Sequence, residues 1–199
     1  MKILAFSDLH RDMDATKQMV EASADADVVV GAGDFATKGM GLLDTINILK
    51  AIDKPIILTS GNHDNLIELT EVCIEWENVR LLHGNGITID DVDFFGLGCA
   101  IPNRGDAVWN ETLEEDEAAK MLVNCPSNAV LVTHSPPHNC ADLQRDGSHQ
   151  GSEAIAACIM DKTPVLNLCG HIHFSWGASG TLGKTPVHNL GPTVNWFEV

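Results

Sequence analysis

Short β-branched apolar runs alternate with helical patterns through the first third of this 199-residue chain. The runs at Lys2 to Phe6, Asp27 to Gly31 and Pro55 to Thr59 predict strands. The segments between them, Thr16 to Ser23 and Leu42 to Ala51, predict helices. This β-α-β-α-β order predicts a parallel sheet, because a crossover through a helix returns the chain to the same end of the sheet.

The remainder of the chain predicts further strands and helices. After a helix from Asn65 to Trp76, the close spacing of the apolar runs favours antiparallel strands at Val79 to Leu82, Ile87 to Ile89 and Asp93 to Gly98. Two further helices are predicted, at Thr112 to Val123 and at Gly151 to Met160, and Thr112 and Glu115 are spaced as a capping box for the first of them. Strands are predicted at Ala129 to Thr133 and Val165 to Cys169, and hairpins from Phe174 to Val199. There is no repeat, linker or change of composition, so we expect a single α/β domain over residues 1–199.

The charge of the chain limits its partners. Lys and Arg number 12 against 28 Asp and Glu, and the net charge of -16 opposes attraction to nucleic acid or an anionic membrane. No segment approaches the ~18 consecutive apolar residues of a membrane helix. The first residues lack the apolar core of a signal peptide, and the six scattered cysteines are typical of reduced thiols. We therefore expect a cytoplasmic protein with a small-molecule partner.

Five apolar runs end in a polar cluster that contains a potential metal ligand. The clusters are Ser7-Asp8-Leu9-His10, Gly33-Asp34, Gly61-Asn62-His63-Asp64, Thr133-His134 and Gly170-His171-Ile172-His173. Loops beyond the carboxyl ends of the strands form the ligand crevice of an open α/β sheet, so the five clusters are expected to meet. Each cluster alone is equally consistent with a turn, a cap or a structural histidine. Together, however, they hold five of the nine histidines.

The residue types in these clusters indicate which ions would bind. Imidazole, carboxylate and amide oxygen suit divalent Mn, Fe, Co, Ni or Zn, whereas structural zinc sites favour thiolates. One ion needs three or four ligands, and the clusters offer more than that. We therefore expect two divalent ions.

In this order, the clusters resemble the signature of the calcineurin-like metallophosphoesterase superfamily, and the compact chain is similar to its small, cap-free bacterial and archaeal members. The resemblance implies a four-layer α/β/β/α sandwich with two central mixed sheets. It also implies one metal held by Asp8, His10, Asp34 and His173, and a second held by Asp34, Asn62, His134 and His171. The resemblance further implies that His63 protonates the leaving oxygen and that Asp64 orients His63.

Such a site implies a metal-dependent phosphoesterase, in which a hydroxide held by two metal ions attacks a small phosphate ester. A phosphodiesterase is favoured over a monoesterase, and Arg104, in the polar loop after Gly98, is a candidate for holding the phosphate, although a solvated surface Arg is an equal interpretation. Two alternatives stay open: a catalytically silent interaction scaffold with the same fold, and a nucleotide phosphatase or nuclease. Chain length and the charge of -16 both count against a nuclease. Neither the oligomeric state nor the physiological ester is predicted.

Overall fold

The structure is a computed structural model that describes all residues from Met1 to Val199. Five α-helices are present: α1 (Met13–Ser23), α2 (Leu42–Leu49), α3 (Leu66–Ile74), α4 (Glu115–Leu122) and α5 (Glu153–Lys162). The strands are β1 (Lys2–Phe6), β2 (Val28–Ala32), β3 (Ile56–Thr59), β4 (Val79–Leu81), β5 (Asn85–Ile89), β6 (Val92–Leu97), β7 (Val130–Thr133), β8 (Leu166–Cys169), β9 (Ser179–Leu182), β10 (Thr185–Asn189) and β11 (Asn195–Glu198). A single 3-10 turn, η1, covers His173–Ser175. No helix is both long and apolar enough to cross a membrane.

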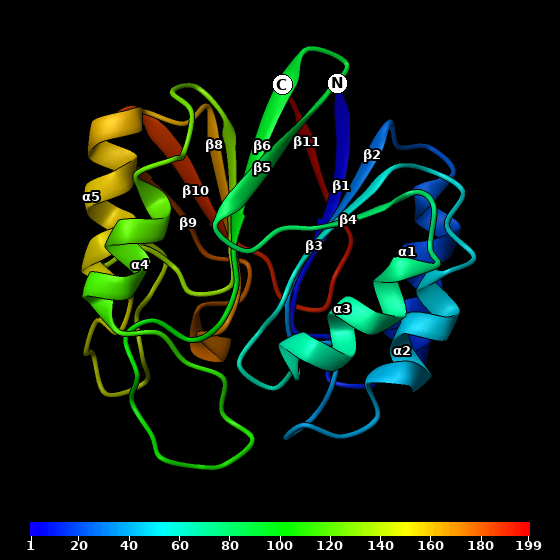
Figure 1. Cartoon of the computed structure of the whole chain (residues 1–199). Coiled ribbons are helices and arrows are strands. Elements are labelled where there is room, and N and C mark those ends of the chain that lie inside the picture. Colours follow the sequence, from blue (N-terminus) through cyan, green and yellow to red (C-terminus); the bar gives the residue numbers. More distant parts are fainter.

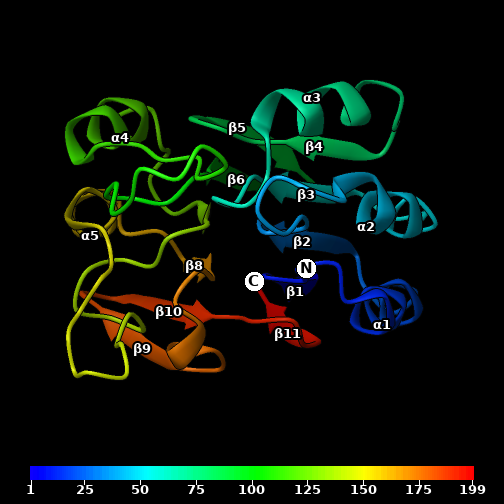
Figure 2. The ribbon, with the colours of Figure 1, turned by 90° about the horizontal axis from the view of Figure 1, so that it is seen from below.

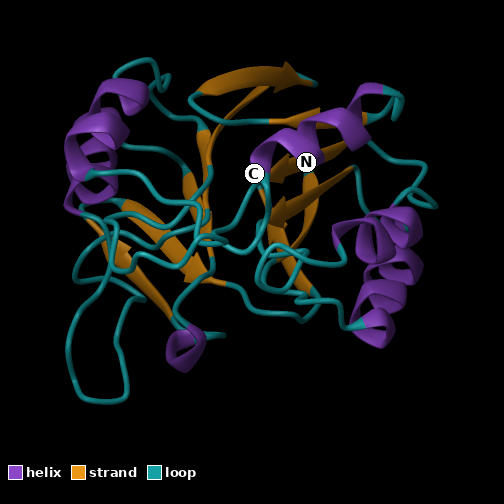
Figure 3. Cartoon of the chain, turned by 60° about the horizontal axis from the view of Figure 1, so that its bottom comes forward, coloured by secondary structure: helices purple, strands orange, loops and turns teal.

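The strands form two sheets that face each other between two layers of helices (Figures 1 and 3). The first sheet has the order β11-β1-β2-β3-β4, in which β1 to β4 are parallel and β11 is antiparallel to β1. The second has the order β5-β6-β7-β8-β10-β9, with antiparallel pairs only at its two edges. Helices α1 to α3 cover the first sheet, and α4 and α5 cover the second (Figure 2). The expected four-layer α/β/β/α sandwich with two mixed sheets is confirmed.

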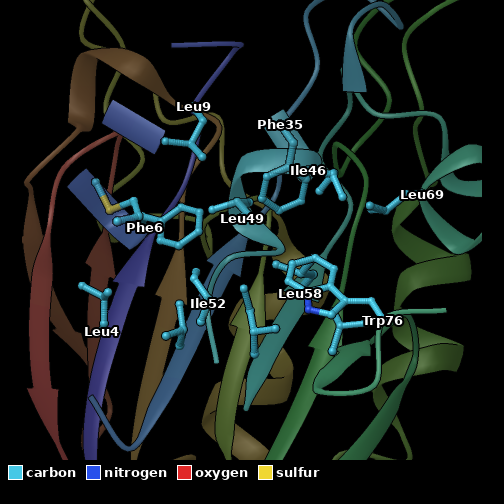
Figure 4. Packing of buried hydrophobic residues seen from close by; sticks show 14 of the residues in the cluster. Leu4, Phe6, Leu9, Phe35, Ile46, Leu49, Ile52, Leu58, Leu69 and Trp76 are labelled. Carbon is cyan, nitrogen blue, oxygen red and sulfur yellow. The ribbon is translucent and has the colours of Figure 1, made fainter. Parts of the chain in front are cut away.

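The central strands are apolar on both faces because both faces are buried. Leu4 and Phe6 of β1 point into the cluster between the first sheet and its helices, together with Phe35 and Ile46 (Figure 4). Ile3 and the other alternate residues of β1 instead join the cluster between the two sheets. Period-two alternation thus divides one continuous apolar run between two separate cores.

The central and C-terminal strands differ from the prediction in three places. The runs between Val79 and Gly98 were expected to be antiparallel, but only β5 and β6 pair in this way. Strand β4 is parallel to β3 and β6 is parallel to β7, because α3 and α4 serve as crossover connections. The tail forms one hairpin, β9 and β10, whereas β11 crosses to the first sheet and pairs with β1.

Helix α4 also begins later than predicted. Its N-cap is Glu114, which forms the capping box with Glu117 in place of Thr112 with Glu115. The carboxylate of Glu115 instead accepts hydrogen bonds from the start of α5: Ser152 Oγ at 2.8 Å and the backbone N–H of Ala154 at 2.8 Å. Glu115 of α4 therefore links α4 to α5, since a carboxylate at a helix N-terminus satisfies free N–H groups and is favoured by the helix dipole.

Candidate metal centre

The loops after five strands bring the predicted ligands together at one end of the sandwich, the end onto which Figure 2 looks. Asp8, His10, Asp34 and His173 each offer one ligand atom, and these atoms all lie within 4.8 Å of one another. The Nε2 atom of His10 is 3.3 Å from Asp34 Oδ2 and 3.2 Å from His173 Nε2. Both carboxylates are buried, whereas His173 is exposed, so this group opens to solvent.

The second predicted set is equally compact. The Nε2 atom of His134 lies 3.1 Å from Asn62 Oδ1 and 3.5 Å from Asp34 Oδ2. The Nδ1 atom of His171 lies 3.0 Å from the same Asn62 oxygen. Asp34 Oδ2 is therefore close to ligands of both sets, as a shared ligand would have to be.

Hydrogen bonds from the opposite side of each ring fix which atom faces the centre. His10 Nδ1 lies 3.2 Å from the Ala36 carbonyl oxygen, and His134 Nδ1 lies 2.8 Å from the Ala32 carbonyl oxygen. A carbonyl oxygen only accepts, so each Nδ1 carries a proton and each Nε2 faces the centre, where the neutral ring would offer its lone pair to a metal ion. Likewise, the Asn62 amide donates to Asn110 Oδ1 at 2.8 Å, which turns its own Oδ1 towards the histidines.

The inward-facing atoms suit cations. His134 Nε2 lies 3.1 Å from the Asn62 oxygen, and His10 Nε2 lies 3.3 Å from an Asp34 oxygen. Either a proton on Nε2 or a metal ion between the two atoms is needed at such distances, because two acceptors repel each other. Buried carboxylates, imidazoles and an amide oxygen are a donor set for mid-series divalent ions. The residues present therefore fit the expected metal pair.

Backbone strain coincides with the ligand positions. Asp8, His10, Asp34 and His171 all have left-handed φ values, of 54°, 44°, 60° and 67°. This region costs a non-glycine residue of the order of 1 kcal/mol or more, and it persists where the surroundings enforce it. The strain marks these loops as built to aim particular side chains.

The buried ligands strongly shift one another's pKa values when no metal ion is bound. Burial raises the pKa of Asp34, but the charge and hydrogen bond of His134 outweigh burial and bring it below its ordinary range. Burial opposes protonation of His134, yet the Asp34 carboxylate raises its pKa to about 9. Burial, aided by the charge of His134, lowers the pKa of His171 to about 4. The centre therefore favours a neutral His171.

His63 lies beside the ligands, with its ring centroid 4.7 Å from that of His10. Its Nδ1 accepts the backbone N–H of Lys38 at 2.9 Å, so the neutral ring carries its proton on Nε2. Burial lowers the pKa of His63, which agrees with a neutral ring. The tautomer that can donate from Nε2 is therefore set by a backbone amide.

The Asp64 carboxylate makes no hydrogen bond to His63, so the prediction that it orients His63 is corrected. The Asp64 carboxylate is fully buried and accepts three backbone N–H groups, from Asp34, Ala36 and Gly61, each at 2.8 Å. Burial and the Asp34 charge raise the pKa of Asp64 to about 7, while two of these N–H bonds counteract the rise. Asp64 therefore ties together the loops that carry Asp34 and Asn62.

Several residues at the centre were not predicted from the sequence. Trp176 Nε1 donates to Asp8 Oδ2 at 3.2 Å, and the Trp109 ring lies 4.5 Å from the His63 ring. Asn110 orients Asn62, as described above. These residues lie in loops without a recognisable motif, and the only signal was their proximity in sequence to Arg104 or to the last cluster.

A cavity of about 330 Å³ lies over the centre. Its walls are entirely polar and are formed by Asp34, Asn62, His63, Gln144, His171 and His173. None of these six residues is Lys or Arg. Arg104 is not among them and is exposed, so its role in phosphate binding stays a prediction.

The chain is similar in sequence to known proteins over most of its length. The model of the calcineurin-like phosphoesterase family matches residues 1–175. A curated relative, the UPF0046 protein K07C11.7 of Caenorhabditis elegans, is 25% identical over 89% of this chain, which spans 65% of that relative's length.

Two solved structures share the fold at low identity. Protein TT1561 of Thermus thermophilus is similar with a TM-score of 0.76 and 20% identity, over 99% of this chain and 98% of that chain. A novel archaeal phosphodiesterase is similar with a TM-score of 0.58 and 20% identity, over 96% of this chain and 84% of that chain. At such identity the likeness extends to the fold alone.

Proposed function

The chain belongs to the calcineurin-like phosphoesterase family, and on that premise we propose that it hydrolyses small phosphate diesters at the centre formed by Asp8, His10, Asp34, Asn62, His134, His171 and His173. Two divalent ions, when bound, would lower the pKa of the attacking water and neutralise charge that develops on the phosphoryl oxygens. Residues 1–199 act as one domain in this proposal, and the two ions come from the set Mn, Fe, Co, Ni and Zn.

The chain's own residues supply the remaining chemistry. Water oxygen forms the new bond to phosphorus, and the bond to the leaving alcohol oxygen breaks. His63 donates a hydrogen bond from its Nε2–H to this departing oxygen and stabilises the negative charge that develops there, with the ring held by Lys38 N–H. The proton released by the attacking water balances the proton taken up by the alcohol, so the ring stays neutral and a phosphate monoester remains. Asp64 keeps the loops in register without contacting the substrate.

The observation that carries the preference for diesters is the lining of the cavity over the centre. Its six wall residues include no Lys or Arg. A phosphate monoester brings close to two negative charges at neutral pH, and sites for such groups usually supply guanidinium or ammonium groups. A diester brings only one negative charge, so it places a smaller demand on the protein.

The proposal is tested by comparing bis-p-nitrophenyl phosphate with p-nitrophenyl phosphate as substrates, in the presence of Mn²⁺ or Ni²⁺. We expect kcat/KM to be higher for the diester, and we expect both EDTA and His63→Ala to suppress it. Activity that survives EDTA and His63→Ala would refute the assignment. A higher kcat/KM for the monoester would refute the diester preference alone, and a protein silent on both substrates would favour the scaffold alternative.

A further inference from the structure

A second polar cavity borders the metal centre. It has a volume of about 750 Å³ and is lined by His10, Arg11, Met13, Thr37, Asp44 and Asn47, and we call it the Arg11–Asp44 cavity. Only His10 among these residues belongs to the predicted ligand set. The other residues have no role in the chemistry described above.

Contacts place this cavity next to His63, where the leaving oxygen departs. The His10 ring, which forms one wall, lies 4.7 Å from the His63 ring, centroid to centroid. Thr37, which forms another wall, donates from Oγ1 to the His10 carbonyl oxygen at 3.0 Å. The residue after Thr37 is Lys38, whose N–H holds His63 Nδ1 at 2.9 Å. Two wall residues of the cavity are therefore linked to His63: His10 packs against its ring, and Thr37 precedes the residue whose N–H binds it.

The charges in the cavity balance each other. The Arg11 Nη2 atom lies 3.3 Å from Asp44 Oδ2, and both side chains are partly exposed. Gly41 leaves room for the guanidinium of Arg11, because a Cβ at this position would lie 2.2 Å from Arg11 Nε. The second oxygen of Asp44 and the amide of Asn47 make no hydrogen bond within the protein, so they are free to bind a ligand.

We propose that the Arg11–Asp44 cavity binds the leaving alcohol of the diester, and that this alcohol is uncharged and carries several hydroxyl groups, as glycerol and sugars do. A hydroxyl both donates and accepts, so it matches a carboxylate, a guanidinium and an amide at once. A second anionic group would meet the Asp44 carboxylate, and an ammonium group would meet Arg11. Met13 offers an apolar contact for the carbon skeleton. This inference rests on the proposed function.

The test compares three diesters with Mn²⁺ as the metal: glyceryl methyl phosphate, 2-carboxyethyl methyl phosphate and bis-p-nitrophenyl phosphate. In both methyl esters the methanol and the larger alcohol are poor leaving groups, so release of glycerol or of the carboxyl alcohol in place of methanol reports on the cavity. We expect the wild type to prefer the glyceryl ester over the carboxyethyl ester. Asp44→Asn and Asn47→Ala should lower the ratio of kcat/KM for the glyceryl ester to that for the nitrophenyl ester by about tenfold and about fivefold, respectively. Asp44→Asn replaces a charge-assisted hydrogen bond with a weaker neutral one, and Asn47→Ala removes a hydrogen-bond partner.

Asp44→Asn also removes the negative charge, so it should raise kcat/KM for the carboxyethyl ester relative to kcat/KM for the glyceryl ester. The matched control is Lys17→Ala, which breaks the exposed Lys17 to Asp14 pair at 3.5 Å on α1 and should leave every ratio unchanged. Ratios within twofold of wild type in both cavity variants, or a wild type that prefers the carboxyethyl ester, would overturn the inference while the proposed function stands. A wild type that hydrolyses none of the diesters would remove both.

Discussion

Replacement of Asp64 separates a structural role from a catalytic one. The Asp64 carboxylate is fully buried and accepts N–H groups from Asp34 and Gly61 at Oδ2 and from Ala36 at Oδ1. The truncation leaves three buried N–H groups without an acceptor, at about 1 to 3 kcal/mol each, and water entering the vacated space recovers part of the loss, so Asp64→Ala should lower the free energy of unfolding by about 3 to 5 kcal/mol. That is a large share of the roughly 5 to 15 kcal/mol that stabilises a typical domain.

The isosteric variant sharpens this prediction. In Asp64→Asn, an amide oxygen at the Oδ2 position keeps two bonds, but the amide nitrogen then faces the Ala36 N–H, so we expect a loss of about 2 to 3 kcal/mol. Unfolding in urea at pH 8 with EDTA, followed by circular dichroism, measures both variants in the ionised state of Asp64 and without metal effects. Asp53→Asn, at an exposed position, is the control for the chemical change.

A different outcome would restore the catalytic role. Suppose that the free energy of unfolding of Asp64→Asn, extrapolated linearly to zero urea, lies within about 0.5 kcal/mol of the wild-type value while kcat is lost. The carboxylate then does not hold the loops as described. In that case its effect on His63 would have to be electrostatic. A loss of stability together with impaired metal binding is the result that the three N–H bonds predict.

Three other positions give further predictions. Gly61→Ala should abolish metal binding in a calorimetric titration, because its Cβ would lie 2.0 Å from Asp34 Oδ1. Trp176→Phe removes the donor to Asp8 and should weaken metal affinity about tenfold in that titration with little change in unfolding temperature, since such outer partners tune affinity more than folding. Burial lowers the pKa of His83 from its ordinary 6.5. As pH falls below 6.5, the unfolded chain binds a proton that the folded protein resists, so the free energy of unfolding falls between pH 7 and 5, and His83→Gln should reduce this fall in urea titrations at each pH.

Local patterns predicted most of the secondary structure, because the apolar residues that give each strand or helix its periodicity are also the residues that pack in the core. Strand β1 has the predicted bounds, Lys2–Phe6, and the helices are found in the predicted places with shifted ends. Helix α1 begins earlier than expected because Asp12 caps it, accepting N–H groups from Asp14 and Ala15. The position of the five clusters after predicted strands also indicated that they would meet, because the strand ends of parallel units lie at one edge.

What the sequence did not predict depends on contacts between distant segments. Strand β11 joins β1 at the far end of the chain, and no local pattern distinguishes this pairing from a hairpin. Glu115 was predicted to form a capping box with Thr112, but its carboxylate instead caps α5 by accepting from Ser152, 37 positions further along the chain. Asp64 was assigned to the neighbouring His63 by adjacency, whereas the backbone turns the two side chains to different partners.

The non-ligand residues of the motifs have a physical explanation of their own. A Cβ at Gly170 would lie 2.3 Å from Asp8 Oδ2, and a Cβ at Gly61 would meet Asp34, so each glycine lets its loop approach a carboxylate of another loop. Three ligands, Asp8, Asp34 and His171, adopt left-handed backbone, which is costly for any residue but glycine even though Asp and His tolerate it better than most. The signature therefore encodes loop geometry as well as ligand identity. A chain with the same ligands but alanine at these glycines should fold its sheets and still fail to assemble the centre, because the sheets are packed by apolar clusters that do not include the glycines.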